Sequence, residues 1–315
     1  MKTGPWRLIF MGTPAFALSS LEALLAAGEE VAAVVTQPDK PRGRGQKVSP
    51  SPVKELALSW HLPVLQPRSL KDPDFMAALR AYEPELMIVV AYGRILTHEV
   101  LALPKVGFLN VHASLLPRYR GPAPINWALI RGDRETGVTI QWVKYEVDTG
   151  EVFLQERLPI LDEDNAGSLT AKLADRGAVL LVQSLEMLRR GEAIRQVQDE
   201  SGVTFAPRLT PEMRRINWEL PANETANWIR GLDPRPGAYT LSQGQVLKLF
   251  GARVKKPAGH PAAAGTVLGL TSQGLEIACS AGSVTIAELQ LAGHKRLAAA
   301  EFLRGRPLSK QVLGR

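Results

Sequence analysis

The first 35 residues alternate short apolar runs with one helical segment, and this order limits the fold more than any other feature. Arg7–Gly12 is apolar and ends in glycine, which is typical of a parallel strand buried on both faces. A helix is expected from Pro14 to Ala27, and Gly28 suits its end. Val31–Val35 predicts a second buried strand. This order predicts an α/β fold with a Rossmann-like, doubly wound and mostly parallel sheet.

The turn after the first strand is Gly12-Thr13-Pro14, and it lacks the Gly-x-Gly-x-x-Gly pattern of dinucleotide-binding sheets. A nicotinamide dinucleotide site is therefore not indicated. Leu86–Ala91 is the most apolar of the later predicted strands, and a long helix near Ser168–Arg190 is expected to cover the sheet.

The stretch from Phe108 to Pro117 runs from an apolar strand into a loop and carries two polar side chains near the strand end. Side chains alternate along a strand, so Asn110 and His112 are expected on one side and Val111 on the other. Ligands of open α/β sheets bind at this carboxyl edge. An Asn can donate to a developing oxyanion, and a His can exchange protons near neutral pH. A structural hydrogen-bonding pair is the alternative interpretation.

A second polar stretch favours the catalytic interpretation. Gly137–Gly150 has the pattern of a strand of β-branched and aromatic residues, followed by a turn that holds Asp148. An Asp on a neighbouring loop can orient His112 and stabilise its positive form by opposite charge. Asn110, His112 and Asp148 are therefore our candidate catalytic residues.

A basic segment, Gln37–Lys47, has Gly and Pro between its cations and cannot be a helix or a central strand. Its cations are Lys40, Arg42, Arg44 and Lys47. One interpretation is an ordinary solvated loop. The other is a mobile basic finger that becomes ordered on the phosphates of a nucleic acid.

The length of 315 residues suggests about two domains. We predict a catalytic domain at 1–192, a polar linker at 193–206 and a C-terminal domain at 207–315. Short strand-like runs separated by glycines in the last third predict a small antiparallel β-barrel of the OB-like kind. Barrels of this kind often bind oligonucleotides.

The formal charge of +7 is concentrated in the last third of the chain. From residue 206 onward there are 15 Lys and Arg against 7 Asp and Glu, whereas the remainder holds 23 against 24. A positive domain attached to a neutral one suggests a polyanionic partner, with nucleic acid first. A basic surface that only favours solubility is the alternative. The cations of this domain that we predict to contact phosphate are Lys255, Lys256, Lys295 and Arg296.

Cysteine usage and hydropathy exclude several classes of protein. The single Cys279 excludes a disulfide framework and a cysteine metal cluster, and we expect no metal. No signal peptide is visible, and no apolar run reaches the roughly 18 residues of a membrane span. We therefore expect a soluble, cytoplasmic protein without membrane contacts, and a monomer.

These motifs together resemble those of a known family. Asn110, His112 and Asp148, with the loop Ser114-Leu115-Leu116-Pro117, resemble the signature of the folate-dependent formyltransferase superfamily. Over nearly its whole length the chain is similar to the methionyl-tRNA formyltransferase family, notably in Met11–Phe16, the basic segment, Ser51–Val53 and Leu209–Trp218. Tyr145 and Asn126 depart from the superfamily pattern, which usually has Val or an acidic residue at the first position and Gln at the second.

The resemblance implies a reaction, the transfer of a formyl group from the co-substrate 10-formyltetrahydrofolate to the α-amino group of methionyl initiator tRNA. It implies that Asn110 and His112 donate to the tetrahedral oxyanion. Asp148 would orient His112 and can help to remove the amine proton. The residues implied to hold the folate by backbone contacts are Ser114, Leu115, Leu116 and Pro117.

Two other functions stay open. One is a folate-dependent formyltransferase that acts on a small amine, such as an amino sugar or a ribotide, which would need neither the basic segment nor a basic C-terminal domain. The other is a catalytically inactive RNA-binding module, which would have no reason to keep Asn110, His112 and Asp148 together.

Overall fold

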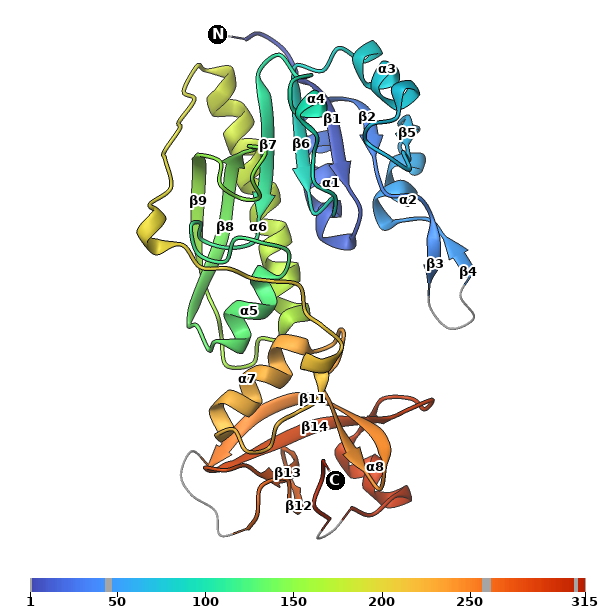
Figure 1. Ribbon diagram of the computed structural model, residues 1–315, viewed down its shortest axis with the longest axis vertical. Coiled ribbons are helices and arrows are strands. Elements are labelled where there is room, and N and C mark those ends of the chain that lie inside the picture. The colour runs from blue at the N-terminus through green and yellow to red at the C-terminus, as the bar shows by residue number, and fades with distance from the viewer. Residues whose placement is uncertain (1, 43–46, 257–261, 309–310, 315) are drawn as a thin grey trace. The chain divides into compact units, whose positions relative to one another are not determined.

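The computed structural model describes residues 2–42, 47–256, 262–308 and 311–314, and Figure 1 shows the course of the chain. The chain forms two compact units and enters the second of them three times. The first unit contains Met1–Pro122, Gly137–Leu158 and Ala171–Ala206, and the second contains Ala123–Thr136, Pro159–Thr170 and Pro207–Arg315.

The first unit is built on a seven-stranded sheet. Its strands are β1 (Arg7–Gly12), β2 (Glu30–Val35), β5 (Val64–Leu65), β6 (Leu86–Val90), β7 (Gly107–His112), β8 (Glu135–Trp142) and β9 (Val152–Pro159). They lie in the order β5-β2-β1-β6-β7-β8-β9, with parallel pairing from β5 to β7 and antiparallel pairing of β8 to β7. The predicted Rossmann-like, mostly parallel sheet is confirmed.

The central strands are apolar along their length because both faces of a parallel sheet are covered. In β1, every residue from Leu8 to Met11 is fully buried. β1, β6 and β7 run parallel, so their carboxyl ends lie at one edge of the sheet, where β7 ends in His112. This edge is where open α/β sheets place their ligands.

Several helices of the first unit begin at capping residues. The shorter helices are α1 (Leu18–Ala26), α2 (Pro52–Ser59), α3 (Pro73–Ala81) and α4 (His98–Leu101). Ser51, Asp72 and Thr97 each accept a backbone N–H at the start of α2, α3 and α4 respectively. Proline fills the first position of α2 and α3, where no N–H is needed.

The long helix α6 (Ala166–Arg189) packs against the sheet at a glycine. A Cβ on Gly177 would lie only 2.6 Å from Val111 Cγ1, so the helix approaches β7 closely there. β7 thus turns Val111 toward α6, and its alternation turns Asn110 and His112 toward the opposite face. None of the helices in the described ranges is long and apolar enough to span a membrane.

The basic segment is neither helix nor central strand, but it is not wholly a loop. β3 (Lys40–Arg42) pairs with β4 (Lys47–Ser49) in a two-stranded antiparallel ribbon. Pro41 is compatible with this ribbon because each strand of a two-stranded sheet is an edge strand. The interpretation as an ordinary solvated loop was therefore wrong for Lys40–Arg42 and Lys47, which lie in strands. Arg44 lies outside the described residues.

The second unit contains a six-stranded antiparallel sheet. Its strands are β10 (Tyr239–Ser242), β11 (Gln245–Lys256), β12 (Val267–Thr271), β13 (Gly274–Ala278), β14 (Ser283–Leu291) and β15 (Leu297–Ala298). They lie in the order β10-β11-β14-β13-β12, and β15 also pairs with β14. The predicted antiparallel sheet is confirmed, although it is a half-barrel, since β10 and β12 do not pair among the described residues.

The core of the second unit lies between this sheet and its helices. The helices are α5 (Pro124–Ile130), α7 (Ala222–Leu232) and α8 (Ala299–Gly305). Ile229 of α7 is fully buried in a cluster with Leu249 and Ile286 of the sheet. α7 also contacts α5, where Asn126 Nδ2 donates to Gly231 O at 2.7 Å. This helix pair helps to explain why 123–136 belong to the second unit.

Candidate active site

β7 and β8 bring polar side chains together at the carboxyl end of β7. In their antiparallel register, Asn110 lies opposite Gln141 and His112 lies opposite Thr139. Residues directly opposite each other share a face of the sheet. One face therefore carries four polar side chains where the two strands pair.

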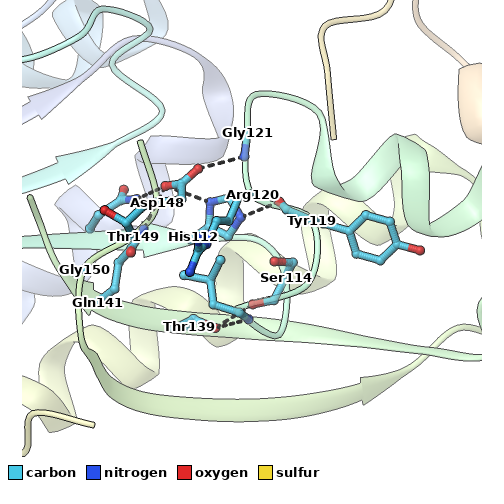
Figure 2. A network of polar contacts seen from close by, with 12 residues as sticks. His112, Ser114, Tyr119, Arg120, Gly121, Thr139, Gln141, Asp148, Thr149 and Gly150 are labelled. Carbon is cyan, nitrogen blue, oxygen red and sulfur yellow. Dashed lines mark hydrogen bonds and ion pairs between the residues drawn. The ribbon is translucent and has the colours of Figure 1, made fainter. Parts of the chain in front are cut away.

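Asp148 joins this group from the loop between β8 and β9. Its Oδ1 lies 2.8 Å from Gln141 Nε2, 3.4 Å from Asn110 Nδ2 and 3.5 Å from His112 Nδ1. Its Oδ2 accepts the backbone N–H of Gly121 at 2.9 Å, and Figure 2 shows the carboxylate between Gly121 and His112. The structure thus brings Asn110, His112 and Asp148 to one point, with Gln141 and Gly121 as the nearest partners of Asp148.

His112 is 6% exposed and lies between two hydrogen-bond acceptors. Its Nε2 lies 3.0 Å from Tyr119 O, and its Nδ1 lies 3.5 Å from Asp148 Oδ1. Either ring nitrogen therefore has an acceptor within reach when it carries a proton. The Nδ1 contact is long for a hydrogen bond, so little is lost when a substrate atom replaces Asp148 as the partner of Nδ1.

The backbone around Asp148 has an uncommon conformation. Asp148 has φ +56°, in the left-handed region that side chains rarely adopt. Two residues later, a Cβ on Gly150 would lie 1.6 Å from Trp142 O, so this position requires glycine. The loop therefore depends on specific contacts to keep Asp148 where it lies.

The turn that begins at Ser114, predicted to bind folate, is held by hydrogen bonds within itself and to the strands β8 and β9. Ser114 Oγ donates to Arg118 O at 2.6 Å. Thr139 Oγ1 donates to Ser114 O at 2.6 Å and accepts from Leu116 N at 3.1 Å, and Gln155 Nε2 donates to Leu116 O at 2.7 Å. These bonds fix the shape of the turn beside His112.

Known protein families match both the N-terminal and the C-terminal part of the chain. The family described as Formyl transferase matches residues 6–185, which include Asn110, His112 and Asp148. The chain belongs to the formyltransferase family. The family described as Formyl transferase, C-terminal domain, matches residues 208–307.

Relatives in this formyltransferase family match nearly the whole chain. A methionyl-tRNA formyltransferase of Moorella thermoacetica is 49% identical over 309 residues, which cover 98% of this chain and 99% of the relative. A methionyl-tRNA formyltransferase of Pelotomaculum thermopropionicum is 46% identical over 307 residues and 98% of both chains.

Solved structures share the fold of this formyltransferase. HypX from Aquifex aeolicus in complex with tetrahydrofolic acid has a TM-score of 0.67 at 21% identity, covering 98% of this chain. This chain spans about half of HypX, 49% of its length. WlaRD, a sugar 3N-formyl transferase, has a TM-score of 0.67 at 17% identity over 93% of this chain and 100% of its own.

The cations of the basic segment are described only in part. Lys40 is exposed, and its Nζ donates to Gln37 Oε1 at 2.6 Å. The side chains of Arg42, Lys47 and Lys256 lie outside the described part of the chain, as does all of Arg44.

Two neighbouring cations of the second unit differ in their surroundings. Lys295 is exposed to solvent. Arg296 forms ion pairs with Glu288 and Asp233, and its guanidinium lies 4.0 Å from the centroid of the Phe250 ring. The charge of Arg296 is therefore balanced within the protein. Lys255, the other candidate with a described side chain, is exposed like Lys295.

The sequence-based search missed residues that surround Asp148. Gln141 had a usable signal, because it is a polar residue between the apolar Ile140 and Trp142 in a predicted strand. Gly121 and Tyr119 had no such signal, since their contacts to Asp148 and His112 depend on how the Pro-rich loop folds. Among the residues that the structure describes, no three His, Cys, Asp or Glu side chains form a group that could hold a metal ion.

Proposed function

We propose that this chain transfers the formyl group of 10-formyltetrahydrofolate to the α-amino group of methionyl initiator tRNA, and thereby supports translation initiation in the cytoplasm. The observation that carries the proposal is the 49% identity to a methionyl-tRNA formyltransferase over 98% of the chain. The gathering of Asn110, His112 and Asp148 at the carboxyl end of β7 supplies groups suited to the chemistry.

The nucleophile of this reaction belongs to the substrate, so the protein needs none of its own. The neutral amine adds to the formyl carbon. The carbon becomes tetrahedral, and its oxygen becomes an oxyanion. The bond from this carbon to N10 of the folate then breaks, the amine loses a proton and N10 gains one. The protein has to hold two substrates together, stabilise the oxyanion and move a proton.

We assign stabilisation of the oxyanion to Asn110 and His112. One N–H of Asn110 faces Asp148 at 3.4 Å, which leaves its second N–H free to donate to the substrate. The long contact from His112 Nδ1 to Asp148 allows that N–H to contribute as well. Two donors at a developing negative charge match the chemistry of acyl transfer.

Asp148 has two roles in the proposal. It orients His112 by opposite charge, and it accepts the amine proton directly or through a water molecule. Gln141 and Gly121 hold its carboxylate at 2.8 and 2.9 Å, so it does not rely on His112 for its own position.

Folate and tRNA contacts are assigned to two different kinds of surface. For the folate we propose the turn from Ser114 to Pro117. Each of its carbonyl oxygens has a second lone pair that can accept a hydrogen bond from the folate in addition to its bond within the protein. For tRNA we propose the cations of the ribbon β3–β4 and the exposed Lys255 and Lys295, because phosphates require positive charge. We expect the protein to act as a monomer.

A formylation assay tests the proposal. Wild-type protein is mixed with 10-formyltetrahydrofolate and, separately, charged initiator methionyl-tRNA, charged elongator methionyl-tRNA, an amino sugar nucleotide and a ribotide amine. The proposal predicts rapid formylation of the initiator tRNA, slower reaction of the elongator and none of the small amines. Preferential formylation of a small amine would replace this function with the alternative transferase.

A further inference from the structure

The segment 194–206, here called the strap, runs along the first unit beside the proposed active site. Gln196 and Val152 exchange backbone hydrogen bonds of 3.0 and 2.8 Å near its start. Arg120 N donates to Thr204 O at 2.9 Å, and Ala206 N donates to Arg120 O at 2.8 Å. These residues were expected to form a polar linker, yet their backbone groups bond to the loop that follows Pro117.

The strap supports the partner of His112. Tyr119 N donates to Thr204 Oγ1 at 2.9 Å, and Tyr119 O lies 3.0 Å from His112 Nε2. Gly121 follows closely: a Cβ at that position would lie 2.8 Å from Ala206 O. The same Gly121 donates its N–H to Asp148. The strap therefore contacts both residues, Tyr119 and Gly121, whose backbone groups bond to His112 and Asp148.

Gln198 joins the strap to the backbone of the Asp148 loop. Its Nε2 donates to Asp148 O at 2.9 Å and to Gly150 O at 2.7 Å, so one amide binds two carbonyls of the loop whose Asp148 has φ +56°. Gln198 is 6% exposed, and these bonds are largely shielded from water. Without this donor, the partly buried carbonyl of Asp148 and the buried carbonyl of Gly150 would lose this partner.

Arg120 holds the other end of the Gln198 amide. Its Nε and Nη2 donate to Gln198 Oε1 at 3.0 and 2.9 Å, which sets the orientation of the amide. Arg120 is itself only 6% exposed, and its outer side pairs with Glu200, whose side chain is 75% exposed. The hydrogen bond from Arg120 lowers the pKa of Glu200. The buried Arg120 thus orients the amide of Gln198, and this amide bonds to the loop that carries Asp148.

We propose that Gln198 and Arg120 are positioning residues for formyl transfer, which act through Asp148 and touch neither substrate. The proposal rests on the function proposed above. Gln198 keeps Asp148 in its uncommon backbone conformation, so that Oδ1 faces Asn110 and His112. Arg120 keeps Gln198 in the one orientation that donates to the loop. Small displacements of a reacting group are costly, since about 1 Å can lower a rate roughly a hundredfold.

The test variant is Gln198→Glu, because it changes only the end of the side chain that faces the loop. A carboxylate still accepts from Arg120, but it cannot donate to Asp148 O and Gly150 O. We expect kcat to fall roughly 10- to 100-fold, with KM for both substrates within about twofold of wild type. Gln198→Met removes the same donor without adding charge. If one of the two variants fails to unfold cooperatively, the kinetics of the other variant test the proposal. Glu192→Gln, at an exposed residue just before the strap, is the matched control and should leave kcat within about twofold of wild type.

A double-mutant cycle separates positioning from general damage to the fold. If Gln198 acts through Asp148, then Gln198→Glu should add less than about a twofold loss in an Asp148→Asn background. Single-turnover measurements can follow these slow variants. A folded Gln198→Glu protein with wild-type kcat, or losses that multiply fully in the cycle, would overturn the inference. Failure of wild type to formylate methionyl-tRNA would instead overturn the proposed function, so the two failures are distinguishable.

Discussion

The two units carry polar residues in contrasting ways. In the first unit, Asn110, His112 and Asp148 lie in a network whose members bond to each other and to the backbone. In the second unit, Lys255 and Lys295 stand exposed on the surface. Buried networks fix geometry, whereas exposed cations supply charge that salt can screen.

This difference predicts that variants of the two units change different kinetic constants. Loss of a group that acts in the transition state lowers kcat with little change of KM. Loss of a surface cation weakens binding of a polyanion and reduces its dependence on salt. The two units can therefore be distinguished by kinetics even where both sets of variants lower kcat/KM.

The largest effect is expected at the oxyanion donors. Asn110→Ala and His112→Ala should each lower kcat roughly 100- to 1000-fold, the usual loss for one such donor. KM for both substrates should change little, and steady-state formylation kinetics measure both quantities. His294→Ala is the matched control, since His294 is exposed in the second unit. Near-normal turnover in either variant removes that residue from the mechanism.

A smaller effect is expected at the basic segment. Replacement of Lys40, Arg42, Arg44 and Lys47 by Glu should raise KM for methionyl-tRNA and leave KM for formyl-folate unchanged. The slope of log kcat/KM against log salt should become shallower by about 0.7 to 0.9 for each phosphate that the variant no longer neutralises. Kinetics at several salt concentrations measure this slope, and an unchanged slope would argue against binding of phosphates by the ribbon.

The neighbours Lys295 and Arg296 sharpen the comparison within one surface. Lys295→Ala should reduce the salt slope by about one unit if it contacts phosphate. Arg296→Ala should reduce it less, because Glu288 and Asp233 already balance that charge. It should instead lower the melting temperature, since the buried Asp233 would be left without its ion-pair partner. Equal changes of salt slope in both variants would contradict the assignment.

The smallest expected effect concerns pH and the stability of the second unit. Burial raises the pKa of Asp233, an effect that the hydrogen bond from Gly251 and the charge of Arg296 only partly offset. The stability contributed by this group is present below its unfolded pKa and is lost as pH rises through the raised folded pKa. Asp233→Asn should therefore gain stability relative to wild type as the pH rises from the ordinary pKa of an aspartate, about 3.9, through the raised pKa of folded Asp233. Melting temperatures across that range measure the gain, and a constant difference would contradict it.

Much of the fold could be predicted because it follows local patterns. The apolar runs of β1, β2 and β6 are continuous, and the alternation in β7 separates Val111 from Asn110 and His112. The glycine-spaced runs of the last third became the strands β11 to β14. Each of these patterns spans only a few neighbouring residues, so it can be recognised in the sequence alone.

Contacts between distant segments could not be predicted in the same way. Gln198 and Asp148 are 50 residues apart, and nothing in the sequence around Gln198 marks it as a partner of a catalytic loop. The grouping of 123–136 and 159–170 with 207–315 has the same origin, since α5 meets α7 across 105 residues at Asn126 and Gly231. A cut at residue 206 would remove the partner of α5, so charge variants of the full chain are the better test of tRNA binding.

Single-turnover formylation at saturating methionyl-tRNA and formyl-folate tests the division of roles most directly. At saturation, binding no longer limits the rate, so only the chemical step is measured. The account predicts that a variant with Lys255 and Lys295 replaced by Glu recovers the wild-type rate, whereas His112→Ala stays roughly 100-fold or more below it. A cation variant that stays slow at saturation, or a His112→Ala protein that reaches the wild-type rate, would contradict the account.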